Sequence, residues 1–206
     1  MNTQIVFVGL YTYYNVPLRT LHPLIDKIEG VDAHTIFYKN YAANKFNLPT
    51  EKEEEIFVDV IKKLNPKLVG ISLLSPYVEI AKRLTYLIKK NTTALVVWGG
   101  VGPTILPEEH IKYADMVCIG EGENTLVDIC DKIQNKKDYS DVTNIWVKKN
   151  GKVVRKNPIS KPVDINQNPI LDLDLFDENR LYRPMGGTIY KMFPVETIRG
   201  CPYTCR

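Results

Sequence analysis

The sequence has no apolar run that approaches the ~20 residues of a membrane-spanning helix, so no membrane span is expected. It also has no dense basic stripe. Its 27 basic and 24 acidic residues are spread along the chain, with a net charge of +3, so nucleic acid is not an expected partner. Cysteine is scarce, and the four cysteines form no disulfide framework. The N-terminus lacks a basic region followed by an apolar secretory core, and we therefore expect a cytoplasmic protein.

Apolar segments alternate with segments of helical periodicity over the first two thirds of the chain. Strands this uniformly apolar are buried on both faces, which indicates a parallel sheet between two layers of helices. Right-handed crossovers then give a doubly wound, five-stranded α/β domain of Rossmann-like or flavodoxin-like type. Strands are expected at 4–10, 33–38, 67–74, 94–98 and 115–119, and helices at 18–29, 50–64, 76–90, 107–113 and 124–133.

Two of these helices begin at residues suited to capping. Thr50 is followed three residues later by Glu53, which is the spacing of a capping box. Ser75 precedes Pro76, and proline is favoured at the first helical position, so we interpret Ser75 as an N-cap.

The rest of the chain has a different character. Two short strands at 144–149 and 152–156 flank Asn150-Gly151, a strong two-residue hairpin signal. Residues 157–184 are proline-rich and are interpreted as an extended connector, and a last strand is expected at 190–198. We therefore predict an α/β domain at 1–138, a small β-hairpin and linker at 139–189, and the truncated start of a further domain at 190–206.

The segments after the predicted strands exclude two common ligand classes. Ligands of open parallel sheets bind beyond the carboxyl ends of the strands. Residues 9–14 read Gly-Leu-Tyr-Thr-Tyr-Tyr and not Gly-x-Gly-x-x-Gly, so a dinucleotide is not expected. A phospho-relay receiver needs an acidic pair after its first strand and an aspartate ending its third. This chain has Gly9-Leu10 and Leu74-Ser75 there.

Small and polar residues follow strands three to five instead. Ser72 and Ser75 have hydroxyls that can bind an amide or a phosphate, although Ser75 can equally serve only as a helix cap. The run 99–104, Gly-Gly-Val-Gly-Pro-Thr, and the run 120–123, Gly-Glu-Gly-Glu, let backbone approach a bulky ligand closely. The alternatives are a tight turn for the first run and favourable charges at a helix N-terminus for the second.

The cysteines divide into two pairs. Cys118 and Cys130 lie in apolar segments and are expected to be small core residues. Cys201 and Cys205 form Cys-x-x-x-Cys at the end of the chain, and thiolates favour iron–sulfur centres. Half of a zinc site or two incidental thiols would show the same spacing.

Taken together, these motifs resemble the cobalamin-binding domain of B12-dependent radical SAM enzymes. The resemblance rests on Gly70-Ile-Ser72, on the runs 99–104 and 120–123, and on the Arg-Gly-Cys ending, and it covers essentially the whole chain. It implies a corrin over the strand ends with its nucleotide tail beside the sheet. The implied cofactor-binding residues are Ser72, Ser75, Gly99, Gly100, Gly102, Pro103, Thr104, Gly120, Glu121 and Gly122.

The resemblance also implies a 4Fe–4S cluster held by Cys-x-x-x-Cys-x-x-Cys. Cys201 and Cys205 would be two of its ligands, and the third would follow the end of the given sequence. S-adenosylmethionine would bind the open iron in a radical SAM barrel that this chain lacks. The full-length enzyme would methylate or cyclise a small-molecule substrate, and the chain alone is expected to be inert.

One departure concerns the lower face of the cobalt. Cobalamin proteins that supply a histidine there carry Asp-x-His-x-x-Gly after the first strand, and this chain does not. His34 belongs to a similar Asp-x-His run, but on the second strand, and His110 is expected in a short surface helix. We therefore expect no histidine lower ligand. Two alternatives stay open: a domain of this fold that binds no corrin and docks a barrel or partner, and a free-standing small-ligand domain.

Overall fold

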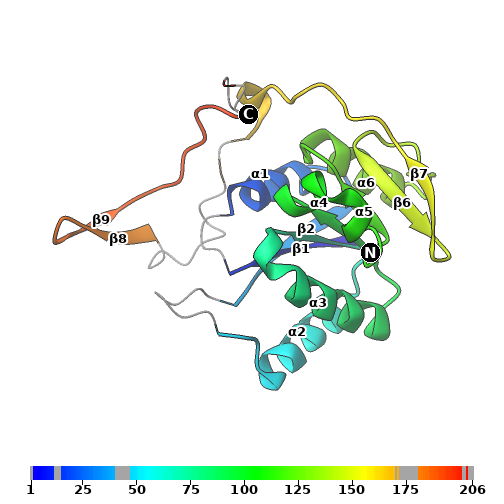
Figure 1. The fold of residues 1–206 in the computed structure, drawn as a ribbon, viewed down its shortest axis with the longest axis horizontal. Helices are drawn as coiled ribbons and strands as arrows, with labels where there is room; N and C mark the ends of the chain where they lie inside the picture. The colour runs from blue at the N-terminus through cyan, green and yellow to red at the C-terminus, as the bar shows by residue number, and fades with distance from the viewer. Residues whose placement is uncertain are drawn as a thin grey trace.

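The computed structural model describes residues 2–11, 15–39, 47–169, 171, 181–200 and 203, and its centre is a seven-stranded sheet (Figure 1). The strand order is β2-β1-β3-β4-β5-β6-β7. The first five strands run parallel, and the last two are antiparallel. They are β1 (Thr3–Leu10), β2 (Val31–Tyr38), β3 (Leu68–Ser72), β4 (Leu95–Gly99), β5 (Met116–Cys118), β6 (Ile145–Lys149) and β7 (Lys152–Lys156).

Helices cover both faces of the sheet, so the predicted doubly wound α/β fold is confirmed. One face packs against α1 (Val16–Ile25) and α6 (Glu123–Gln134), and the other packs against α2 (Glu51–Leu64) and α3 (Val78–Asn91). The order 2-1-3-4-5 of the parallel strands is that of flavodoxin-like sheets. Two short helices, α4 (Val101–Ile105) and α5 (Pro107–His110), connect β4 to β5. No described helix is both long and apolar enough to span a bilayer.

Local sequence explains where α2 begins but not where α3 begins. The Thr50 hydroxyl accepts the Glu53 N–H at 3.3 Å, and the Glu53 carboxylate accepts the Thr50 N–H at 2.7 Å, so the predicted capping box is confirmed. The interpretation of Ser75 as an N-cap is wrong. Ser75 opens a 3₁₀ turn, 75–77, which closes when the Tyr77 N–H donates to the Leu74 carbonyl, and α3 starts after that turn.

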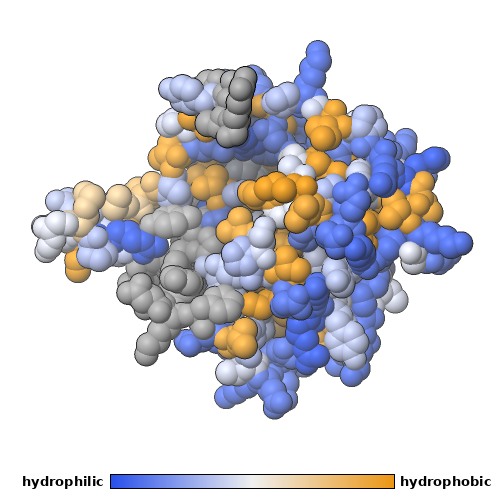
Figure 2. Space-filling model, viewed as in Figure 1, coloured by the Kyte–Doolittle hydropathy of each residue, from blue (hydrophilic) through white to orange (hydrophobic). Residues whose placement is uncertain are grey.

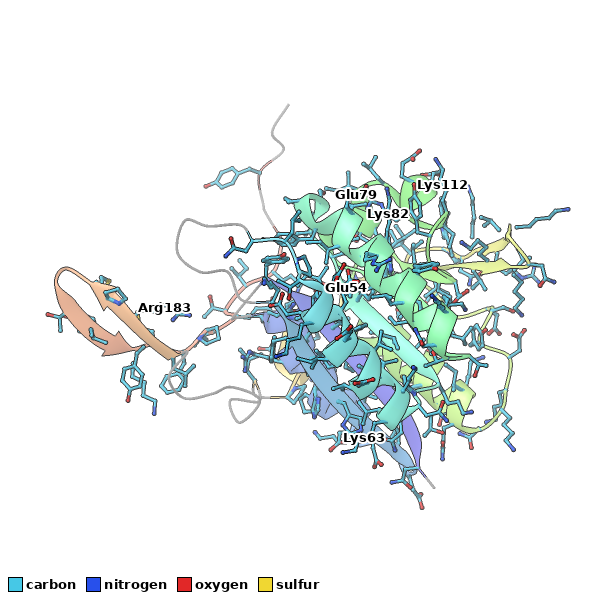
Figure 3. The ribbon with its side chains drawn as sticks, turned by 90° about the horizontal axis from the view of Figure 1, so that it is seen from below. Glu54, Lys63, Glu79, Lys82, Lys112 and Arg183 are labelled. Atoms are coloured by element: carbon cyan, nitrogen blue, oxygen red, sulfur yellow. The ribbon has the colours of Figure 1, made fainter. Side chains whose placement is uncertain are left out.

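Charged side chains cover the outer surface of the α2–α3 layer. Figure 3 views this layer and labels Glu54, Glu79 and Lys82. Arg83 of α3 reaches Glu54 of α2 at 2.6 Å, and Lys82 pairs with Glu79 on its own helix at 2.6 Å. Water screens such exposed pairs, so apolar burial and not charge stabilises this layer.

The core under α2 and α3 is filled by large side chains. Trp98 is fully buried there, and its Nε1–H donates to Thr85 Oγ1 of α3 at 2.9 Å. His110 packs edge-on against Trp98, with ring centroids 5.8 Å apart, and is 4% exposed. The expectation that His110 lies at the surface is therefore wrong, because α5 turns this ring inward onto the indole.

The hairpin β6–β7 was predicted from the sequence, but its pairing with the main sheet was not predicted. Asn150 and Gly151 have φ of 52° and 75°, as a two-residue turn of primed type requires. The hairpin does not stand apart from the sheet, because Ile145 of β6 pairs with Cys118 of β5 and extends the sheet beyond its parallel part. The outer strand β7 is exposed along its whole length and carries Lys152, Arg155 and Lys156, charges that discourage pairing with another chain.

A second hairpin, β8 (Tyr182–Met185) and β9 (Thr188–Lys191), projects away from the sheet (Figure 1). The predicted strand at 190–198 is wrong beyond Lys191, since residues 192–199 form no regular element. Pro194 lacks an N–H and interrupts strand pairing. Residues 192–200 instead run back from the hairpin to the main sheet.

Candidate functional site

A cavity of about 580 Å³ lies at the carboxyl ends of β3, β4 and β5, on the face covered by α1 and α6. This volume is typical of sites for small molecules and cofactors. The cavity is bordered by the strand ends below, the two helices on one side and the segment 196–200 at its mouth. Its lining residues include Phe7, Leu18, Leu21, Gly70, Ser72, Val97, Gly99, Cys118, Gly122, Leu126, Glu196 and Arg199.

The cavity exists because the strands carry small residues at matching positions. Ser72 of β3 pairs in register with Gly99 of β4, so this row of small residues has one short side chain and one hydrogen at the cavity. Gly9 of β1 continues the row, but Asn15 and Leu18 take up the space beside it. Side chains alternate between the faces of a strand, so the neighbouring positions Ile71 and Trp98 fill the opposite core. The α1–α6 face therefore lacks bulk at its carboxyl end.

Two glycines of the cavity wall are not required by the fold. A Cβ added at Gly99 would lie 3.7 Å from Cys118 Cβ, and one at Gly122 would lie no closer than 3.7 Å to any neighbour, which is ordinary contact. Neither residue has a positive φ. Because neither packing nor backbone conformation demands glycine there, the missing side chains leave space that a ligand can fill.

Seven of the ten residues predicted to bind the cofactor line this cavity. They are Ser72, Gly99, Gly100, Thr104, Gly120, Glu121 and Gly122. Ser75 lies outside it on the exposed 3₁₀ turn, and Gly102 and Pro103 are buried in α4 without reaching it. The structure therefore brings together every predicted residue of the run 120–123, but only some of those predicted after β3 and β4.

The polar groups of the wall have different uses. The Thr104 hydroxyl accepts the Gly120 N–H at 2.9 Å and donates to the Gly100 carbonyl at 2.8 Å, so it joins the loops after β4 and β5. Ser72, by contrast, has no hydrogen-bond partner for its hydroxyl among the described residues. Its hydroxyl is thus available to a ligand.

The sequence did not indicate the apolar wall or the charged mouth. Leu18 and Leu21 of α1 and Leu126 of α6 belong to ordinary helical periodicity, and only the fold shows that they border empty space. At the mouth, Arg199 Nη1 lies 2.7 Å from Glu123 Oε1 and 3.3 Å from Glu121 Oε1.

Arg199 also pairs with Glu196 of its own segment, through Nη2 at 2.7 Å and Nε at 3.0 Å. The hydrogen bonds that Arg199 donates to Glu196, and then its hydrogen bond to Glu123 and the charge of that carboxylate, raise the pKa of Arg199 above its ordinary value. The guanidinium is therefore held in its charged form at the mouth of the cavity.

The three histidines all lie among the described residues, and none of them lines the cavity. His34 on β2 contacts Gln4 Oε1 at 2.6 Å, His22 contacts Thr35 Oγ1 at 3.0 Å, and His110 lies under Trp98. In the part of the chain that the structure describes, no three histidine, cysteine or acidic side chains are arranged to hold a metal ion. The predicted cluster ligands Cys201 and Cys205 lie outside the described residues.

Cys118 and Cys130 are buried, as predicted, and burial raises the pKa of each thiol from 9.0 to about 12. At pH 8 that shift lowers the reactive thiolate fraction about a thousandfold. We expect N-ethylmaleimide to leave both thiols unlabelled in the folded chain at pH 8 and to label both in guanidinium, as read by peptide mass spectrometry. Labelling of native Cys118, which lines the cavity, would contradict its burial.

Comparisons with known proteins agree with this geometry. A family model described as the B12 binding domain matches residues 14–130. An uncharacterised methyltransferase of Pyrococcus horikoshii is 29% identical over 150 residues, covering 71% of this chain and 32% of that protein. The chain thus spans about a third of the length of this curated relative.

Two solved structures share the fold. The cobalamin-dependent S-adenosylmethionine radical enzyme OxsB, solved with aqua-cobalamin and S-adenosylmethionine bound, matches 84% of this chain and 24% of its own, with a TM-score of 0.66 and 18% identity. The radical S-adenosylmethionine methyltransferase TsrM from Kitasatospora setae matches 77% of this chain and 30% of its own, with a TM-score of 0.59 and 18% identity.

Proposed function

Because the chain belongs to the B12-binding domain family, we propose that its cavity holds part of a cobalamin. The observation that carries this proposal is the pair Ser72 and Gly99, in register on β3 and β4, whose small size leaves the cavity open where ligands of open α/β sheets bind. The apolar walls from α1 and α6 suit a flat aromatic group. The free Ser72 hydroxyl suits a polar atom at its edge.

We further propose that the chain is the cobalamin-binding region of a radical SAM enzyme. The support is the Cys-x-x-x-Cys spacing of Cys201 and Cys205, together with the likeness to a methyltransferase and to radical enzymes that use S-adenosylmethionine. Cys201 and Cys205 would supply two thiolates to a 4Fe–4S cluster. S-adenosylmethionine and the small-molecule substrate would bind a radical SAM barrel outside this chain. We therefore expect the chain alone to be catalytically inert.

In this proposal the chain's own residues bind and orient the cofactor. The leucines of α1 and α6 would pack against its buried part, Gly99 and Gly122 would leave room for it, and Ser72 would donate or accept a hydrogen bond. Cobalamin bound there would supply a cobalt centre able to carry a methyl group, which suits C-methylation; cyclisation is the other reaction that we propose for the full-length enzyme. None of the three histidines, which all lie in the part of the chain that the structure describes, lines the cavity, so none is proposed as a lower ligand.

The direct test is retention of cyanocobalamin by the purified chain through gel filtration. Cyanocobalamin is chosen because its cobalt already holds cyanide and is not captured by free thiols. We expect its visible absorbance to elute with the protein. A protein peak without absorbance would overturn the proposal and favour a domain of this fold that only docks a barrel or a partner.

A matched pair of serines tests where the cofactor lies. Ser72→Ala removes the free hydroxyl of the cavity, and we expect it to weaken cyanocobalamin binding roughly two- to tenfold, as loss of one hydrogen bond does. Ser75→Ala, on the exposed turn outside the cavity, is expected to leave the affinity unchanged. Equal losses for both variants would contradict binding in the cavity.

A further inference from the structure

The mouth of the cavity is a junction of three segments that are distant in sequence. Glu121, in the loop after β5, accepts the Val163 N–H with Oε2 and faces Arg199 with Oε1. Glu123, at the start of α6, accepts from Asn168 Nδ2 at 3.4 Å and from Arg199 at 2.7 Å. The two carboxylates thus hold both the connector and the segment 196–200 against the cavity.

Charge makes Arg199 the decisive member of this junction. Glu121, Glu123 and Glu196 all contact its guanidinium, and among the described residues no other cationic side chain pairs with these three carboxylates. Glu123 is the most buried of them, with its side chain 8% exposed. Removing the guanidinium would leave a buried carboxylate uncompensated beside two like charges, a strongly unfavourable arrangement.

Arg199 also lines the cavity, and it stands two residues before Cys201 in the sequence. Arg199 and Gly200 both line the cavity. Two residues of chain span at most about 7 Å, so an anchor at Arg199 limits how far the next residues can move from the mouth. The same ion pairs therefore hold residues that line the cavity and that precede Cys201 in the sequence.

We propose that Arg199 is a positioning residue, which ties the segment 196–200 to the mouth of the cofactor cavity through Glu121 and Glu123. Filling of the cavity and anchoring of the segment 196–200 are thereby coupled. A ligand packed against Arg199 and Gly200 holds the segment in place, and an anchored segment slows escape of the ligand. The inference rests on the proposed function, because the coupling requires a cofactor in the cavity.

The test uses the reactivity of the terminal thiols. N-ethylmaleimide labelling of Cys201 and Cys205 is followed by mass spectrometry in the wild-type chain and in Arg199→Ala, each with and without saturating cyanocobalamin. We expect the cofactor to slow wild-type labelling. In Arg199→Ala we expect labelling to be about tenfold faster and no longer sensitive to the cofactor. Buried Cys118 and Cys130 serve as internal controls for an intact fold.

Two further variants separate charge from general destabilisation. Glu123→Gln keeps the shape but removes the charge, and we expect faster labelling than in wild type. Arg199→Lys keeps the charge, and we expect partial restoration of the slow rate. Arg155→Ala, on exposed β7, is the matched control and is expected to label like wild type. Melting curves accompany the labelling, because Arg199→Ala leaves buried Glu123 without its partner and is expected to lower the Tm, whereas Arg155→Ala is expected to melt like wild type.

The outcomes distinguish the two proposals. A wild-type chain that retains no cyanocobalamin overturns the proposed function. A chain that retains cyanocobalamin, but whose thiols label at the same rate in wild type and Arg199→Ala, overturns the role of Arg199 and leaves cobalamin binding intact. Cofactor-independent labelling of a wild-type chain that binds cyanocobalamin also overturns the coupling.

Discussion

Replacement of Gly99 by leucine is expected to abolish cyanocobalamin binding while the chain stays folded. Gly99 ends β4 in the row of small residues that opens the cavity, and a leucine side chain there would occupy space proposed for the cofactor. The backbone accepts a side chain at this position, because φ is not positive and an added Cβ makes only ordinary contact with Cys118. We expect at least about a hundredfold weaker binding.

Stability should move little or even rise, because the new side chain fills a void with apolar atoms. Titration of the visible absorbance measures affinity, and thermal unfolding measures stability. Gly99→Ala provides an intermediate step, with a loss of only a few fold. Ser75→Leu adds the same bulk outside the cavity and should bind like wild type. If Gly99→Leu binds normally, the cofactor does not lie where we place it.

The features of the fold that could be predicted are those that residues close together in the sequence determine. The capping box of Thr50 and Glu53 needs only its own helix, and the Asn150-Gly151 turn needs only its own hairpin. Gly99 and Ser72 were found because a strand end is recognisable locally and strand ends converge in a parallel sheet. In each of these cases, short-range sequence carries the physical cause.

What was missed depends on pairing between distant segments. The sequence of residues 145–149 does not indicate that they pair with β5, because an amphipathic hairpin can pack against many different surfaces of a protein. The second hairpin was missed for a different reason. Its turn is Gly186-Gly187, both with positive φ, and Gly-Gly is a local hairpin signal that adjacent residues alone provide. Arg199 and Glu123 meet only because the chain returns to the cavity after a long connector.

The structure assigns different roles to the neighbouring glycines Gly99 and Gly100, which the sequence alone does not distinguish. The sequence treats Gly99 and Gly100 alike, as a pair that permits close approach. The structure separates them: Gly99 borders the cavity with unstrained backbone, whereas Gly100 has φ 100° and ψ −165°, a region that is essentially restricted to glycine. One glycine leaves space for a ligand, and the other is required by the chain path.

Gly100→Ala is therefore expected to be the most destabilising single-methyl change in this loop. Its Cβ would lie 2.9 Å from the Leu73 carbonyl oxygen and 3.2 Å from the Leu73 nitrogen, and both are backbone atoms that cannot swing away. Strained backbone and overpacking together cost about 3 kcal/mol or more. For a chain of this size we expect the Tm to fall by roughly 6–12 °C.

Two other glycines show which cause dominates. Gly151→Ala also places alanine at a positive φ, 75°, but with no atom within 4 Å, so it reports backbone strain alone and should cost about 1 kcal/mol. Gly99→Ala has neither strain nor clash and should melt like wild type. Comparable melting temperatures for Gly100→Ala and Gly151→Ala would show that the Leu73 backbone yields, and that the loop beside the cavity is more adaptable than its packing indicates.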